Sequence, residues 1–229
     1  MAARSYGQYC GVTTAVELVG ERWALLIIRD LLVGPRRYTD LKQGLPRIPT
    51  NILSARLKEL QDAGVVRRVP LSHRGLVYEL TAFGRELEPI VLALGRWGFA
   101  AMGEPEPDAV VTADSLTMAL RTAFRPDAAA ALPATGYDLH VGGVGLRARV
   151  RGQALAVRRL DAGTGAGSGA GSGADAVIVA GPEIRGIISG ELRPADALER
   201  GLVTVAHGDT ALLGRFATTF HIDPAAAAA

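Results

Sequence analysis

Short polar and basic side chains gather between residues 36 and 74, and their types suit contacts with a nucleic-acid duplex. Amides and hydroxyls can hydrogen-bond to base edges, a methyl group can contact thymine, and guanidinium groups can neutralise phosphates. On the helix expected from Thr50 onward, such side chains occupy the face opposite a stripe of leucines. The candidate DNA-binding residues are Arg36, Arg37, Thr50, Asn51, Ser54, Ala55, Arg56, Lys58, Arg67, Arg68, His73 and Arg74.

Each of these residues also has a purely structural interpretation, because solvated helix faces and charged hairpins are common in proteins. The DNA-binding interpretation therefore rests on the agreement of charge, helix order and hairpin rather than on any one side chain. We expect Asn51, Ser54 and Thr50 to contact base edges. The arginines outside the helix are expected to contact phosphates or the minor groove.

The elements that must position these residues follow from hydrophobic periodicity and turn residues. Helices are expected at 12–19, 23–32, 40–43, 50–63 and from about 82 to 97, the last kinked at Pro89. Thr39 and Thr50 are the expected caps of the third and fourth helices, and Gly34-Pro35 ends the second. Strands at 65–69 and 76–80 flank a turn, which predicts a hairpin. Two short helices joined by a tight turn and followed by a hairpin predict a winged helix-turn-helix.

The charge is divided unevenly along the chain. Residues 1–102 hold 14 Lys+Arg and 9 Asp+Glu, a balance of +5, whereas residues 103–229 hold 11 and 14, a balance of −3. Two prolines and three acidic residues between Gly103 and Asp108 favour a boundary there. We therefore expect a DNA-binding and dimerisation domain at 1–103 and a second domain at 108–223, with different partners.

The second half alternates strand and helix patterns. Strands are expected at 137–141, 145–151, 153–159, 176–180 and 201–205, and helices at 115–124, after Pro182 and Pro194, and near the end. This order predicts an α+β fold whose sheet is mainly antiparallel with one wet face. Arg147, Arg149 and Arg151 fall on that face, where they could bind an anionic effector, contact another subunit or simply be solvated.

A Gly-rich stretch at 162–174 is expected to be a long loop between strands, with a domain linker as the alternative. All its glycines sit at odd positions, so the G-x-G-x-x-G fingerprint of dinucleotide sites never occurs, and no lysine is near for a P-loop.

Composition and motifs argue against several function classes. A chain of 229 residues that is 48% hydrophobic is expected to be globular. It holds no apolar run long enough for a membrane span, and we see no secretory signal. One cysteine excludes an internal disulfide framework and a cysteine zinc site, and a cytoplasmic location is expected. His73, His140, His207 and His221 lack metal-binding spacing, and there is no G-x-S-x-G elbow. We expect no enzymatic activity, metal or cofactor.

Residues 10–98 resemble the HxlR-type family of bacterial transcription regulators. The matching segments are Cys10, Gly20-Glu21-Arg22-Trp23, Gly34-Pro35-Arg36-Arg37-Tyr38, residues 48–60, Gly64-Val65-Val66 and Tyr78-Glu79-Leu80-Thr81, together with Gly84, Leu87 and Trp97. The resemblance implies a homodimer that binds a palindromic operator, with the first and last helices forming the dimer interface. The short wing tip at 70–75 lacks the Pro-containing insert that is often present in the family.

Cys10 is a candidate redox sensor. In some HxlR-type proteins a cysteine near the N-terminus senses oxidants or electrophiles, and Cys10 occupies the matching position. Such chemistry needs a thiolate, which nearby positive charge, for example from Arg4, or a helix N-terminus would favour. The alternative is a small, buried, apolar residue.

Residues 110–222 resemble the sterol-carrier-protein fold, most clearly in the segment from Gly201 to Asp209 with Leu212 and Phe216. This resemblance implies a pocket for a small apolar effector or a second dimer contact, and the residues of such a pocket are not assigned. The sequence thus predicts a homodimeric regulator that binds double-stranded DNA and responds to an apolar effector. The alternative is a hydrophobic-ligand carrier that keeps a winged helix for dimerisation only.

Overall fold

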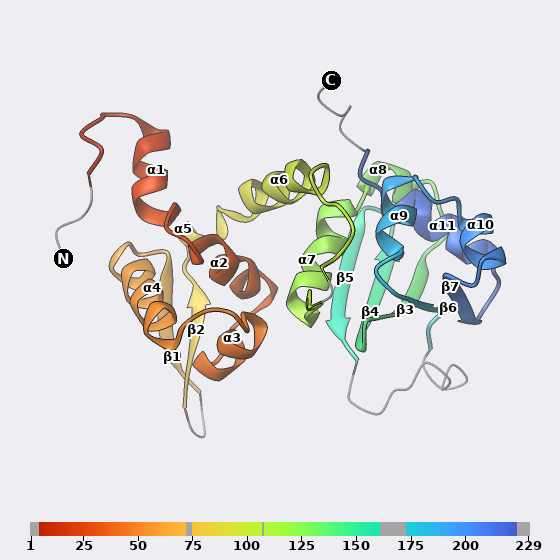
Figure 1. The fold of residues 1–229 in the computed structure, drawn as a ribbon, viewed down its shortest axis with the longest axis horizontal. Helices are drawn as coiled ribbons and strands as arrows, with labels where there is room; N and C mark the ends of the chain where they lie inside the picture. Colours follow the sequence, from red (N-terminus) through yellow and green to blue (C-terminus); the bar gives the residue numbers. More distant parts are fainter. Residues whose placement is uncertain (1–4, 72–74, 107, 161–172, 224–229) are drawn as a thin grey trace. The chain divides into compact units, whose positions relative to one another are not determined.

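The computed structural model describes residues 5–71, 75–106, 108–160 and 173–223, and Figure 1 labels its helices and strands. The chain divides into two compact units, Met1–Val91 and Leu92–Ala229, and the division falls within α6 (Glu88–Phe99). The expected domain limits, 1–103 and 108–223, stay a prediction. Within the described ranges, no helix combines the length and apolar character that a membrane crossing needs.

The first unit is three packed helices followed by a hairpin, preceded by one further helix. Its elements are α1 (Gly11–Val19), α2 (Ala24–Val33), α3 (Tyr38–Gly44), α4 (Thr50–Asp62), β1 (Val66–Pro70), β2 (Leu76–Leu80) and α5 (Ala82–Arg85). Leucines and isoleucines from α2, α3 and α4 fill the core because each helix repeats apolar residues with helical period. The hairpin is antiparallel, with Val66 opposite Leu80. This order confirms the predicted winged helix-turn-helix.

Three predicted details of the first unit are wrong. Trp23 precedes α2 with φ 81° instead of lying inside the helix. Arg37 and Pro49, not Thr39 and Thr50, are the cap residues of α3 and α4. The expected helix at 82–97 is two helices, because Pro89 is the second residue of α6, where its missing N–H costs nothing and a new helix can begin.

The second unit is a five-stranded sheet with helices. It contains α7 (Ala113–Ala123), α8 (Pro126–Ala130), β3 (Thr135–Val141), β4 (Val144–Arg151), β5 (Ala154–Arg159), β6 (Ala176–Ala180), α9 (Ile184–Ser189), α10 (Pro194–Glu199), β7 (Val203–His207) and α11 (Ala211–Thr219). The strand order is β5-β4-β3-β6-β7, and only the pair β3–β6 is parallel among these strands. The α+β prediction with a mainly antiparallel sheet is confirmed. The last strand starts two residues later than expected because Gly201, with φ 65°, forms a left-handed turn after α10.

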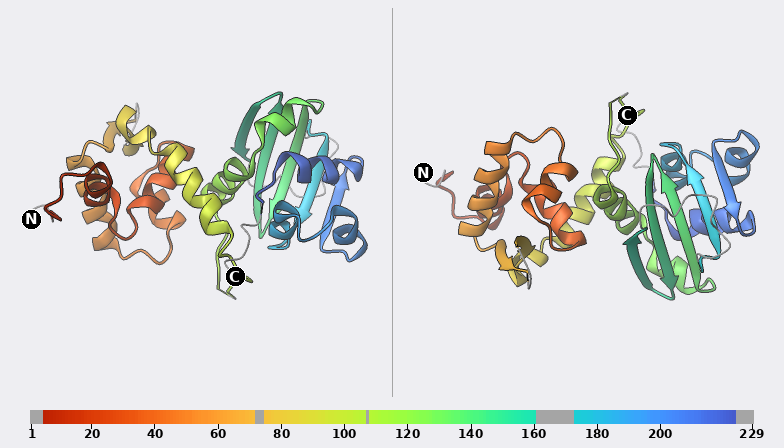
Figure 2. Two further views of the ribbon diagram at one scale, coloured as in Figure 1. Left: turned by 90° about the horizontal axis from the view of Figure 1, so that it is seen from above. Right: turned by 90° about the horizontal axis from the view of Figure 1, so that it is seen from below.

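The helices of the second unit pack on one face of its sheet. Side chains from α7, α9 and α11 form one core with Tyr137, Leu139 and their inward-facing neighbours. Tyr137, Phe216 and Phe220 make an aromatic cluster, with the Tyr137 and Phe216 rings 5.4 Å apart and edge to face. In Figure 2 these helices lie on one side of the strands, and none of the described helices lies on the opposite face of the sheet.

One prediction about that opposite face needs correction. The alternation along β4 placed Arg147 on a wet surface, but its residue exposure is only 6%. Arg147 lies opposite Asp138 on β3, which is 1% exposed, and donates Nε to Oδ1 and Nη2 to Oδ2, both at 2.5 Å. Polar alternation alone cannot reveal such a pair, because a buried bidentate ion pair and a solvated arginine have the same pattern.

Candidate nucleic-acid interface

Helix α4 has one buried and one exposed side. Leu53, Leu57 and Leu60 are buried against the unit's core, since they recur at helical spacing. Of the residues predicted for groove contact on this helix, four are exposed and Ala55 is partly buried. The exposed four are Thr50, Asn51, Ser54 and Lys58.

Tyr38 ties α3 to the start of α4. Its hydroxyl donates to the Thr50 carbonyl oxygen at 2.9 Å and lies 3.2 Å from the Ser54 hydroxyl. Lys42 donates from Nζ to the carbonyl oxygens of Pro46 and Ile48, at 3.1 and 2.7 Å, and so holds the connecting turn. Sequence reasoning missed both residues. Both residues lie on the helix that precedes the candidate recognition helix, 12 and 8 residues before Thr50.

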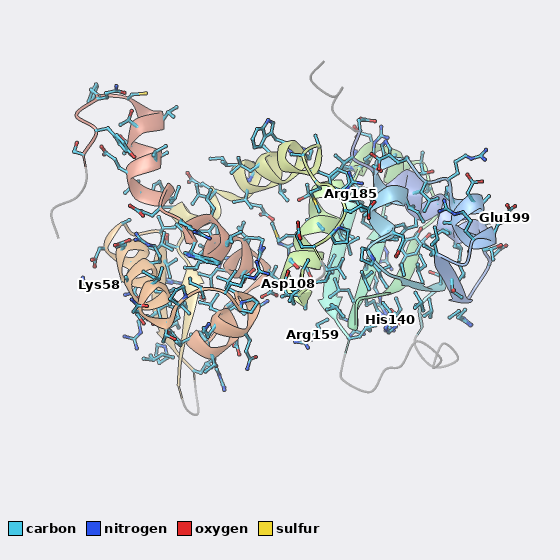
Figure 3. All side chains as sticks on the ribbon, viewed as in Figure 1. Lys58, Asp108, His140, Arg159, Arg185 and Glu199 are labelled. Atoms are coloured by element: carbon cyan, nitrogen blue, oxygen red, sulfur yellow. The ribbon has the colours of Figure 1, made fainter. Side chains whose placement is uncertain are left out.

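Arg56 points to the flank of α4 rather than into the open polar side. Its Nη2 lies 3.3 Å from Glu21 Oε2, its Nη1 contacts Glu59, and only 17% of its side chain is exposed. Arg56 therefore links α4 to the segment before α2. Lys58 is different: it is exposed and points outward in Figure 3, and its hydrogen bond with Asp62, at 2.8 Å, raises the pKa of its amine.

The segment before α2 is held in an unusual backbone conformation. Trp23 has φ 81°, a left-handed value that is rare for a residue with a side chain. The Arg22 guanidinium lies over the indole ring, 5.3 Å from its centroid. A pocket of about 390 Å³ adjoins these side chains and α4. Its lining residues are Glu21, Arg22, Trp23, Arg47, Pro49, Ile52 and Arg56.

The hairpin carries basic residues of two kinds. Arg67 pairs with Glu79 across the strands, with Nε 2.7 Å from Oε1, so part of its charge is compensated. Arg68 is exposed and its guanidinium lies 5.7 Å from the centre of the Tyr78 ring. His73 and Arg74 lie outside the described residues.

Arg36 and Arg37 sit at the junction of hairpin and helices. The backbone of Arg36 pairs with that of Tyr78, which joins the segment before α3 to β2. Arg37 is exposed and its backbone N–H donates to Asp40 Oδ2 at 2.9 Å. Arg47, which was not among the candidates, is also exposed and lies in the turn just before α4. The structure thus places basic side chains on three segments that flank the recognition helix in sequence.

Cys10 is exposed and stands at the N-cap of α1. The backbone N–H groups of Thr13 and Val12, at the start of α1, lower the pKa of its thiol. The structural alternative, a buried apolar cysteine, is therefore wrong. Arg4, which sequence reasoning placed near this thiol, lies outside the described residues.

No other chemistry-bearing cluster is evident in the part of the chain that the structure describes. There, no three His, Cys, Asp or Glu side chains come together in a way that could hold a metal ion. His207 ends β7 as an exposed residue, and Asp209 accepts a hydrogen bond from the Ala211 backbone N–H at 2.9 Å. His207 and Asp209 therefore lie at the end of a strand and in the turn that follows it.

A helix with a polar outer side, tied by a tight turn to the helix before it and followed by a basic hairpin, defines a winged helix-turn-helix protein. Residues 18–106 match the model of the HxlR-like helix-turn-helix family. The HTH-type transcriptional regulator YdzF of Bacillus subtilis is 37% identical over 91 residues, which are 38% of this chain and 84% of YdzF. The chain belongs to this family, which confirms the resemblance for the first unit.

Other relatives match a similar share of the chain. The regulator Rv3095 of Mycobacterium tuberculosis is 42% identical over 97 residues, which are 42% of this chain and 61% of the relative. The chain thus spans about three fifths of the length of that relative. A crystal structure of the redox regulator HypR in its oxidised form is 30% identical, with 42% of this chain and all of that chain covered and a TM-score of 0.38.

Proposed function

We propose that this chain is a homodimeric transcription regulator whose α4 enters the major groove of operator DNA. The observation that carries the proposal is the exposure of the polar side of α4 while its leucine stripe is buried. A groove-reading helix needs this division, because its outer side chains must reach base edges without losing core packing.

The side chains divide into two groups by chemistry. Asn51 can pair with adenine, Ser54 and Thr50 with several base edges, and the Ala55 methyl with thymine. Phosphate contacts fall to the basic residues around the helix, since guanidinium and ammonium groups neutralise backbone charge without reading sequence. These residues are Arg36, Arg37, Lys58, Arg67, Arg68, His73 and Arg74, whereas Arg56 pairs with Glu21 and Glu59 and holds α4 in place.

Dimerisation is supported by exposed apolar side chains on two helices. On α1, Val12 is 73% exposed and Val16 is also exposed, and on α6 Trp97 is 78% exposed beside Ile90 and Leu94. Apolar faces of this kind mark protein–protein contacts. A two-fold dimer would carry two recognition helices, which must lie about 34 Å apart to meet successive half-sites.

Gel-shift titration against DNA upstream of its own gene tests DNA reading. Asn51→Ala should weaken binding by about 1–3 kcal/mol at particular base pairs. Arg68→Ala should weaken binding to all DNA sequences alike and reduce the slope of log affinity against log salt concentration by about 0.9. Arg200→Ala, which removes an exposed arginine from the other unit, is the control. Absence of sequence-selective binding by the wild type, or equal behaviour of the Asn51 and Arg68 variants, would contradict the proposal.

The second unit, in this proposal, has a sterol-carrier-like fold and binds a small apolar effector. Support comes from the aromatic cluster that Tyr137, Phe216 and Phe220 form in its core. Effector binding would shift the population of dimers with the required helix spacing. Native mass spectrometry of protein from its host tests this: bound lipid together with absent operator affinity would favour a carrier instead.

Cys10 supports an additional redox input. A lowered thiol pKa and full access to solvent both favour the thiolate that oxidants attack. Mild peroxide treatment should reduce operator affinity of the wild type and leave Cys10→Ser unaffected. Equal loss in both proteins would remove Cys10 from the proposal.

A further inference from the structure

The sheet of the second unit has a face that no described helix covers. Tyr137, Leu139 and Ala148 point to the helical side, where they join the core. Their neighbours along each strand point to the other side, because side chains alternate across a sheet. This second side is called the outer face below, and Figure 2 shows the strands from both sides.

Three exposed arginines form a strip on the outer face. The register pairs Arg147 with Arg158, Arg149 with Ala156, and Arg151 with Ala154, so these six residues share one face. Arg149, Arg151 and Arg158 are exposed and are called the arginine strip. Alanine stands opposite two of them, and a methyl group leaves the neighbouring guanidinium accessible from above. The strip is about 13 Å long, since four residues of strand separate its ends.

The charge of the strip is not balanced within the unit. Arg147, in the same row, is neutralised by the buried Asp138, whereas the strip arginines make no ion pair with any residue in the described ranges. Asp175 accepts a hydrogen bond from the Gly136 N–H at 2.7 Å, and Gly136 lies opposite Arg149, so one carboxylate stands beside the strip without forming an ion pair with it. Arg149 lies two residues from Arg151 along β4 and diagonally from Arg158 on β5, so a bound anion would reduce the repulsion among these three like charges.

Most acidic residues of the unit belong to its helices and loops rather than to the outer face. Helices α7, α8 and α10 and the loops around α9 and α11 contain them. These residues are Asp114, Asp127, Glu183, Glu191, Asp196, Glu199 and Asp209. Strands β4 and β5 carry five of the eleven arginines in residues 103–229 and no acidic residue.

We propose that the arginine strip binds the phosphate backbone of double-stranded DNA outside the operator, which extends the proposed function from the first unit to the second. A single phosphate or carboxylate engages one or two guanidinium groups, and a strip of this length suits a ligand that repeats its negative charge. Arginine is the side chain best suited to phosphate, because its fork donates two parallel hydrogen bonds. The contact carries no sequence information and adds affinity for any flanking duplex.

The test uses the full chain and a mixed-sequence duplex of about 40 bp, so that it needs no operator. The variant is R149Q/R151Q/R158Q. The matched control is R125Q/R159Q/R200Q, which removes three exposed arginines elsewhere in the unit, including Arg159 on the same strand but the opposite face. Three lost phosphate contacts lower the salt slope by about 2.7. The affinity ratio of wild type to variant should therefore shrink about 40-fold between about 50 and about 200 mM salt.

Rescue and competing ligands complete the test. R149K/R151K/R158K keeps the charges and should restore the salt slope, and circular dichroism should show all variants folded. A strip variant whose slope equals that of the control overturns the proposal, as does a variant that loses affinity for single-stranded RNA but not for duplex DNA. Operator recognition is tested separately, with the Asn51→Ala variant. If that recognition fails, the salt slope measured on the mixed-sequence duplex should stay unchanged.

Discussion

Breaking the buried pair of Asp138 and Arg147 should destabilise the second unit strongly, and removing both charges should not. The two side chains are 1% and 6% exposed and share two hydrogen bonds of 2.5 Å. Asp138→Leu leaves a buried guanidinium without its counter-charge, and Arg147→Met leaves a buried carboxylate. Each change should cost about 3–5 kcal/mol. For a unit of this size the melting temperature should fall by about 10–20 °C.

The double variant Asp138→Leu/Arg147→Met decides whether this reasoning holds. Two apolar side chains of similar volume replace a pair whose desolvation cost offsets most of its attraction, so the double variant should lie within about 1 kcal/mol of the wild type. Hydrogen-exchange mass spectrometry of the full chain measures both units at once: amides of β3 and β4 report the change, and amides of α4 serve as internal reference. Single variants that cost less than about 1 kcal/mol, or a double variant as unstable as the sum of the singles, would refute the argument.

Three further predictions concern the first unit and α6. Tyr38→Phe should lower its stability by about 1 kcal/mol in urea titrations, because the hydroxyl bond to the Thr50 carbonyl is lost; an unchanged midpoint would show that this bond does not hold α4. Gly84→Ala should lower the free energy of unfolding by about 1–3 kcal/mol or more, since a Cβ there would lie 2.2 Å from the Val65 carbonyl oxygen. The control Gly98→Ala, in open space on a helix, should be neutral or stabilising by up to about 1 kcal/mol. Trp97→Asp should convert the dimer to a folded monomer in light scattering, and a dimer that persists would place the interface elsewhere.

Periodicity predicted the parts of the fold that depend on apolar faces. The stripe Leu53, Leu57 and Leu60 fixed both the existence of α4 and the direction of its polar side, and the structure confirms both. The hairpin followed from β-branched residues around a turn, and its register places Val66 opposite Leu80. These features are local and set by hydrophobic burial, which a single sequence records directly.

Features that depend on particular partners escaped sequence reasoning. Trp23 looked like one more apolar position in a helical period, because periodicity carries no information about a positive φ. Arg56 was placed beside the groove face, but it pairs with Glu59 on its own helix and with Glu21, a residue 35 positions earlier in the chain. Arg147 alternated with apolar residues as a solvated side chain would, and only the cross-strand neighbour Asp138 makes it a buried one. Long-range pairings of this kind need the three-dimensional register.

For the charge of the second half of the chain, the positions of the arginines on the sheet matter more than the net charge. Residues 103–229 carry 11 basic and 14 acidic side chains, a balance of −3, which argues against a polyanionic partner for this half. The sheet register instead gathers Arg149, Arg151 and Arg158 on one face and neutralises the fourth arginine of the row with a buried carboxylate. Salt screens electrostatic interactions beyond about 10 Å, so a ligand responds to the charges near its binding surface rather than to the net charge of the unit. An acidic domain can therefore present a basic surface, and the salt slope of the strip variant measures that surface directly.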